Sequence, residues 1–212
     1  ENAVMRRHRA PHCTQSPLAL SSDRLEIAKQ PVIHRFTCVG SIDLDSPTQS
    51  QLAAEAVRAA AHFNNTTFTS NTTVQYVVNT ATGNNMNGFG TQWCAWHSST
   101  SSTFGNIAYT NMPYITDAGA SCGANFVNGG GSGLTDGITI VGGHEFGETE
   151  TDIFPNGGWL DGSGSENGDK CAWISSGQGA SANVTMNGAS FPVQSLWSNA
   201  FNSNAGGCVL SY

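Results

Sequence analysis

The chain has 212 residues, a formal net charge of −7 at pH 7, and only 11% charged residues. This length favours one compact unit with a sizeable buried core, and the acidic balance argues against nucleic acid as a partner, because nucleic acid needs a basic protein surface. No apolar run approaches the roughly 18 residues of a membrane-spanning helix, so we expect no membrane contact. We also expect a monomer.

The cysteines indicate an oxidising compartment. Six of them are spread along the chain without a Cys-x-x-Cys pair: Cys13, Cys38, Cys94, Cys122, Cys171 and Cys208. This spacing favours three disulfides over a thiolate metal site, and pairing of sequence neighbours closes the shortest loops (13–38, 94–122 and 171–208). Asn-x-Ser/Thr sequons occur at Asn64, Asn65, Asn71 and Asn183. We therefore expect a secreted, extracellular glycoprotein.

The first half of the chain predicts a helix between two strands. Residues 32–39 alternate weakly and suit a first strand. Ser46 and Pro47 suit the cap and the first position of a helix over 47–63, on which apolar residues share one face. The apolar run 74–78 is typical of a buried strand.

The middle of the chain predicts a loop, a strand and a second helix. The Ser/Thr run 98–103 is typical of a loop. Residues 107–116 suit a strand, but Pro113 has no N–H to donate, so we expect an edge strand. A helix is expected over 136–152, with Asp136 at its cap or in its first turn.

These elements predict three parts within one compact unit. Residues 1–40 form an N-terminal arm and the first strand, residues 41–152 hold the sheet and the helices, and residues 153–212 form a loop-rich C-terminal part. A turn at 155–158 begins that last part, and 195–200 suit a short helix.

One segment concentrates the chemistry. From His144 to Asp152 it places one histidine and four carboxylates, in the pattern His-Glu-x-x-Glu, one ligand away from the zinc-peptidase motif His-Glu-x-x-His. In a helix His144 and Glu148 lie about 40° apart and could clamp one cation. Zinc accepts both ligand types and keeps one position for water in catalytic sites. Glu145 would take a proton from that water and deliver it to the leaving amine.

A third ligand must come from further along the chain. Asp152 shares the helix face, but about 12 Å of helix separates it from His144, so it is the weaker candidate. Glu166 and Asp169 become reachable because the turn at 155–158 folds their loop back. We expect Glu166 as ligand, with Asp169 orienting His144 or serving as the alternative ligand. One histidine with two carboxylates makes a hard site, so zinc is expected and calcium is possible.

A purely structural interpretation of this segment is also open. Gly142, Gly143 and Gly147 each cost about 1 kcal/mol inside a helix. Without tertiary packing to hold the helix, residues 138–141 would form a strand, and the acidic run would be a solvated turn.

Other chemistries remain alternatives. Asp161, Ser163 and Ser165 alternate as the oxygen ligands of a calcium loop do, although the full calcium-loop pattern is absent. A glycoside hydrolase would use a pair of carboxylates. The candidates for that pair are Glu145, Glu148, Glu166 and Asp169.

The second half of the chain also resembles a known group. The segments IAYTNMPYITDAGASCG, LTDGITIVGGHEFGETETDIFPNGGWLDGSGSENGDKCAW and VQSLWSNAFNSNAGGC resemble secreted bacterial and fungal proteins that are distantly similar to the plant phosphate-induced (exordium-like) extracellular proteins. The shared order is Asp-Gly, Val, His-Glu-x-x-Glu, Gly, an aromatic residue, an acidic residue and Cys, then a final Trp and Cys. The likeness covers roughly residues 105–208.

This resemblance implies a zincin-like α+β fold. In such metallopeptidases a small twisted mixed sheet carries an edge strand above the active-site helix, and here the C-terminal part would be loop-rich and disulfide-linked. The metal positions would be His144 and Glu148, and the base would be Glu145.

The resemblance also implies a protein or peptide substrate, which would add as a strand to 107–116. Tyr109, Asn111 and Tyr114 are the candidate substrate contacts. Tyr109, Tyr114 or His97 could donate to a developing oxyanion. We therefore expect a secreted metal-dependent endopeptidase. Since the plant proteins are better known as growth-related than as enzymes, the alternative is a non-catalytic extracellular binding or signalling module.

Overall fold

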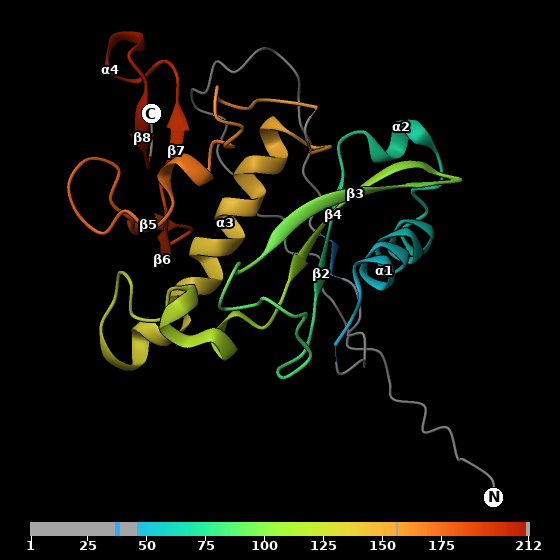
Figure 1. Cartoon of the computed structure of the whole chain (residues 1–212), viewed down its shortest axis with the longest axis horizontal. Helices are drawn as coiled ribbons and strands as arrows, with labels where there is room; N and C mark the ends of the chain where they lie inside the picture. Colours follow the sequence, from blue (N-terminus) through green and yellow to red (C-terminus); the bar gives the residue numbers. More distant parts are fainter. Residues whose placement is uncertain (1–36, 39–45, 156, 211–212) are drawn as a thin grey trace, which may run out of the picture.

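The structure, a computed structural model, describes residues 37–38, 46–155 and 157–210. It confirms a mixed α+β class, in which a four-stranded sheet stands between two helices (Figure 1). The sheet has the order β1-β2-β4-β3, with strands β1 (Thr37–Cys38), β2 (Gln75–Asn79), β4 (Gly105–Met112) and β3 (Trp96–Ser102). Strands β1, β2 and β4 run parallel, and β3 is antiparallel to β4. Among the described helices, none has the length and apolarity to cross a membrane.

Helix α1 (Gln49–His62) begins at a capping box. The hydroxyl of Thr48 accepts the N–H of Gln51, and the Gln51 side chain accepts the N–H of Thr48. The predicted cap at Ser46 is therefore wrong, because Ser46 instead donates its hydroxyl to the carbonyl of Asn85. Of the predicted apolar face, Leu52, Ala56, Ala59 and Ala60 are buried, whereas Phe63, at the C-cap, is exposed. A short helix, α2 (Phe68–Asn71), follows.

The main sheet is covered on both faces. Tyr76 of β2 and Tyr109 of β4 point to one face and pack against α1. Because side chains alternate along a strand, their neighbours point to the other face. There Val77 and Met112 belong to the core that also contains Val141 of helix α3 (Asp136–Thr151). The core is therefore split by the sheet into an α1 layer and an α3 layer (Figure 1).

The prediction that residues 107–116 form an edge strand is wrong. Strand β4 pairs with β2 on one side and with β3 on the other. Pro113 comes after the last residue of β4, so its missing N–H removes no bond from the ladder. In the described part of the chain, the edge beyond β4 is β3, which contains all but the last residue of the run 98–103 that predicted a loop. Threonine and serine fit there because an edge strand needs no apolar alternation on an exposed face.

Helix α3 confirms the helix predicted over 136–152, with Asp136 in its first turn. It follows two 3-10 helices, η1 (Ile115–Cys122) and η2 (Gly130–Thr135). Two of its glycines allow close approach by other segments. A Cβ at Gly137 would lie 1.8 Å from the carbonyl oxygen of Cys122, and one at Gly147 would lie 2.4 Å from Leu196 Cδ1. Tertiary packing therefore compensates for part of the low helix propensity of α3.

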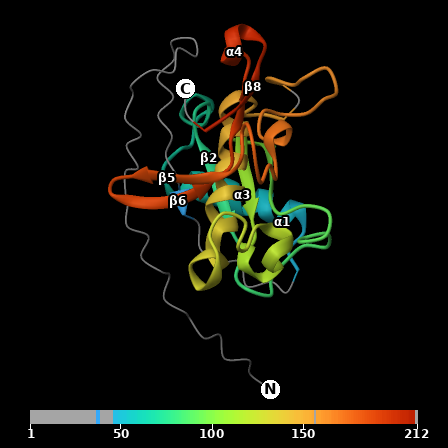
Figure 2. The same cartoon turned by 90° about the vertical axis from the view of Figure 1, so that its left-hand side faces the viewer.

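The C-terminal part contains two hairpins that approach α3, the first near Thr139 and the second near Gly147. Strands β5 (Ala182–Met186) and β6 (Ala189–Val193) form the first, and Figure 2 shows this ribbon extending to one side of α3. Strands β7 (Leu196–Ser198) and β8 (Gly207–Val209) form the second, with the four-residue α4 (Phe201–Asn204) between them. The helix predicted over 195–200 is therefore wrong, because the middle of this segment, Leu196–Ser198, forms strand β7.

Two of the three expected disulfides are present. Cys94–Cys122 joins the start of β3 to η1, and Cys171–Cys208 joins the 3-10 helix η3 (Asp169–Cys171) to β8. The expected partner of Cys38, Cys13, lies outside the described residues, as does the predicted arm before Thr37.

Candidate metal centre

One group of possible ligands forms where α3 meets η3. His144 and Glu148 lie one turn apart on α3, with His144 Nε2 3.0 Å from Glu148 Oε1. Asp169 places its Oδ1 3.7 Å from the same nitrogen. The three residues offer ligand atoms that all lie within 4.8 Å of one another. We call them the open group, because the side chains of His144 and Asp169 are 17% and 53% exposed.

A second group forms where β3 meets the same helix. His97 Nε2 lies 3.1 Å from both carboxylate oxygens of Glu166 and 3.7 Å from Glu148 Oε2. His97 reaches α3 because alternation along β3 sends Trp96 to the other face, where it contacts Tyr109. We call His97, Glu148 and Glu166 the closed group, because their side chains are 5%, 4% and 18% exposed.

Both groups have dimensions that fit a divalent cation. Around a tetrahedral ion with bonds of 2.0–2.1 Å, neighbouring ligand atoms lie roughly 3.3 Å apart. The four closest histidine–carboxylate distances in the two groups run from 3.0 to 3.7 Å. Each group offers one imidazole nitrogen and two carboxylates, a donor set that zinc and manganese both accept. The residues present therefore fit a metal.

Gln194 holds His144 in the orientation that a metal ligand needs. The Gln194 amide nitrogen donates to the carbonyls of Gly168 and Ser195, which turns Gln194 Oε1 toward His144 Nδ1 at 3.3 Å. The proton then stays on Nδ1 and Nε2 is left to bind a cation. Asp169 was predicted to orient His144 through the ring nitrogen that does not bind the metal. This prediction is wrong, because Asp169 Oδ1 approaches Nε2, the nitrogen that is available to a cation.

The charge of the centre perturbs its titrating groups. Burial raises the pKa of Glu145 to about 8, against the opposing charge of His144. Burial alone would lower the pKa of His144, but its hydrogen bond to Glu148 and the charges of the neighbouring carboxylates raise it to about 9. For His97, burial is likewise outweighed by Glu166, so its pKa is raised. The metal-free centre therefore offsets its negative charge with protons, which a cation would displace.

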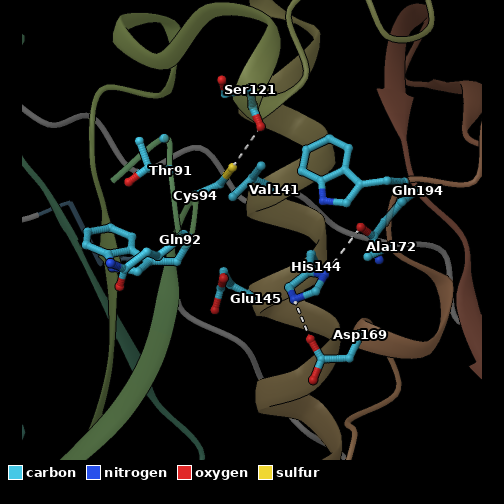
Figure 3. Close-up of a pocket in the computed structure, with 14 residues that line it drawn as sticks. Thr91, Gln92, Cys94, Ser121, Val141, His144, Glu145, Asp169, Ala172 and Gln194 are labelled. Atoms are coloured by element: carbon cyan, nitrogen blue, oxygen red, sulfur yellow. Dashed lines mark hydrogen bonds and ion pairs between the residues drawn. The ribbon is translucent and has the colours of Figure 1, made fainter. Parts of the chain in front are cut away.

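Two residues of the open group, His144 and Asp169, line a pocket. The pocket has a volume of about 320 Å³, and residues along 90–95 of the chain, Val141, Trp173 and Gln194 line it with His144, Glu145 and Asp169. Figure 3 shows Glu145 next to His144 on α3. Asp169 and Gln194 lie on the side of His144 that faces away from Glu145. Glu145 Oε2 is buried and has no hydrogen-bond partner among the described residues. A buried oxygen of this kind requires a partner that the described residues do not supply.

Several predicted site residues lie elsewhere. Asp152 belongs to neither group and accepts the N–H of Gly157. Tyr109 and Asn111 are each 1% exposed inside the sheet, so the structure gives them no surface for a substrate. Tyr114 follows β4 and is 49% exposed. Glu166, expected beside His144, pairs with His97 instead.

In the loop that was considered for calcium, the carboxylate of Asp161 is already bonded to other protein groups. Asp161 Oδ1 accepts the N–H groups of Ser163 and Ser165, and Asp161 Oδ2 lies 2.7 Å from Lys170 Nζ. A calcium ion at this carboxylate would have to displace Lys170.

Two residues of the centre could not be assigned from the sequence. In the sequence, His97 was only one of three candidate oxyanion donors. If 96–102 had been recognised as a strand, alternation would have placed the side chain of His97 on the sheet face opposite to that of Trp96, which is the face that α3 covers. Gln194 has no local signal, because a single glutamine after a strand is common. Its role depends on the contact with His144, 50 residues away in the sequence.

Comparison with known proteins adds no relative. No family model, no curated protein and no solved structure matches the chain. The assignment of the centre therefore depends on its geometry.

Proposed function

We propose that the protein is a secreted metal-dependent endopeptidase with its active site at the open group. The observation that carries this is Glu145, a buried acid at the wall of a pocket, beside three residues that fit a cation. One of its oxygens has no hydrogen-bond partner among the described residues. A general base needs a proton-accepting oxygen that no protein group occupies, and Glu145 has one. Two disulfides fit the extracellular location that the proposal includes.

Each residue of the open group has a separate task. His144, Glu148 and Asp169 would hold the ion, and Gln194 fixes the imidazole of His144. A bound cation would supply Lewis acidity, which polarises a scissile carbonyl. Glu145 takes a proton from the attacking water and passes it to the leaving amine. Its raised pKa of about 8 in the metal-free protein suits a group that must hold that proton between the two transfers.

Strand β3 is the proposed guide for the substrate. In the described sheet it pairs only with β4, so one edge of its backbone is open to an added strand. His97 places this strand directly beside Glu148 of α3. A peptide that extends β3 would therefore pass close to the open group, whereas one at β4 would be blocked by the strands on both sides.

The test is casein cleavage with a matched pair of variants. Glu145→Gln is expected to retain the metal, measured by elemental mass spectrometry, and to lower kcat by about 10²- to 10⁴-fold. Glu150→Gln, the same change on the same helix but outside both groups, should cleave like the wild type. Cleavage that a chelator does not stop, or that Glu145→Gln leaves unchanged, would overturn the proposal. Chelator-insensitive cleavage of a glycan would favour the carboxylate-pair hydrolase.

A further inference from the structure

We propose that the centre binds two divalent cations at once, one in the open group and one in the closed group, bridged by the carboxylate of Glu148. The open-group ion is that of the proposed function, and the second ion is new. The two oxygens of Glu148 already divide between the groups: Oε1 faces His144, and Oε2 faces His97. A bridging carboxylate is a common arrangement at paired metal sites, whose ions lie on the order of 3.5–4 Å apart.

One ion cannot replace this pair in the observed arrangement. Among the described residues, the ligand groups that fit within 4.8 Å contain either His97 or His144, and none contains both. Ligand atoms that share one tetrahedral ion lie roughly 3.3 Å apart. A single ion would therefore leave one histidine and its carboxylate, Asp169 or Glu166, without a metal.

Charge and burial also favour two ions. Four carboxylates meet at the centre: Glu145, Glu148, Glu166 and Asp169. Glu145 and Glu148 are buried, and carboxylates that gather at a largely buried centre require compensating positive charge, which two dications would supply. Glu145 is an independent sign of a missing ligand, because it is 4% exposed and its Oε2 has no hydrogen-bond partner among the described residues.

The two sites differ in whether a protein group orients the histidine ligand. In the open group Gln194 accepts from His144 Nδ1, whereas His97 Nδ1 has no hydrogen-bond partner among the described residues. Such outer partners typically change metal affinity by about 10–100-fold. The open group therefore fills first. The closed group fills second, and its ion ties β3 to α3 and to the loop that carries Glu166.

The experiment is metal titration of the full chain after removal of bound metal. Native mass spectrometry with Zn²⁺ should show two ions per chain, bound in two steps. With Mn²⁺, the electron paramagnetic resonance spectrum should show an exchange-coupled pair. Glu166→Gln, a mild change in a loop, should lower the stoichiometry to one and give the signal of an isolated ion. His97→Ala should do the same, and His62→Ala, at the exposed end of α1, should leave two ions.

One ion per chain at saturation, or two ions without exchange coupling, would overturn this inference. Casein cleavage measured on the same samples separates it from the proposed function. One ion with chelator-sensitive cleavage would refute only the second site. Two coupled ions without cleavage of casein would refute only the peptidase. Circular dichroism of each variant identifies a loss of metal that arises from misfolding.

Discussion

Gln194 Oε1 lies 3.3 Å from His144 Nδ1, and this contact determines which nitrogen of His144 faces the pocket. The amide cannot turn around without loss of its hydrogen bonds to two backbone carbonyls, those of Gly168 and Ser195. A residue in the link between β6 and β7 therefore sets the chemistry of a residue on α3.

Gln194→Met should weaken metal binding by about 10–100-fold, because the methionine keeps the volume of the side chain but accepts no hydrogen bond from His144. Affinity can be measured by competition with a chromogenic chelator. Gln178→Met is the matched control, since the Gln178 amide also donates to a backbone carbonyl, that of Cys208, but lies outside both metal groups. Equal affinities of the two variants would show that Gln194 does not position His144.

Metal should stabilise the fold through Glu148. A ligand that binds only the folded state adds about 2.7 kcal/mol at a concentration of 100 times Kd. Urea unfolding with Zn²⁺ or with a chelator should show a difference of at least this size for the wild type. In Glu148→Gln the difference should nearly vanish, because Glu148 belongs to both groups. Glu150→Gln should behave like the wild type, and the same metal effect in Glu148→Gln would rule out the proposed ligands.

Local patterns predicted the two long helices, α1 and α3, and part of the centre. The apolar face of α1, the extent of α3 and two disulfides between sequence neighbours all follow from short-range signals. The spacing of His144 and Glu148 likewise predicted their contact, because residues four apart share a helix face.

Long-range pairing could not be predicted in the same way. Strand β3 has no apolar alternation, so nothing in its sequence indicated that it would pair with β4 and form the edge of the sheet. As a result His97 was not assigned to the metal centre, and Glu166 was placed with the wrong histidine. The contact of His97 with Glu166 spans 69 residues and depends on both the strand order and the path of the loop after α3.

Two glycines of α3 should respond in opposite directions to alanine. At Gly143 an added Cβ would meet no heavy atom within 4 Å, so Gly143→Ala should stabilise the protein by about 1 kcal/mol through helix propensity. At Gly137 the Cβ would lie 1.8 Å from the carbonyl oxygen of Cys122, so Gly137→Ala should destabilise by about 1–3 kcal/mol. Thermal or urea unfolding of the two variants measures both effects. Destabilisation by Gly143→Ala would mean that the surroundings of Gly143 are more crowded than the structure shows.

The carboxylate of Asp161 should stabilise the fold at neutral pH and cease to do so in acid. The hydrogen bond from Lys170, with those from the N–H groups of Ser165 and Ser163, lowers the pKa of Asp161 to about 2. An unfolded aspartate has a pKa of about 3.9. Because the folded pKa is the lower of the two, the stabilisation is complete above the unfolded value and is lost as the pH falls through the folded value.

Asp161→Asn should therefore be less stable than the wild type at pH 7, and the difference should shrink between about pH 4 and pH 2. Urea unfolding across this range measures the difference, and a carbon-detected NMR titration of the carboxyl reports the pKa directly. Lys170→Met and the double variant complete a cycle: if the ion pair is the cause, Asp161→Asn should cost much less in the Lys170→Met background. A stability difference that stays constant from pH 7 to pH 2 would show that Asp161 acts through its shape rather than its charge.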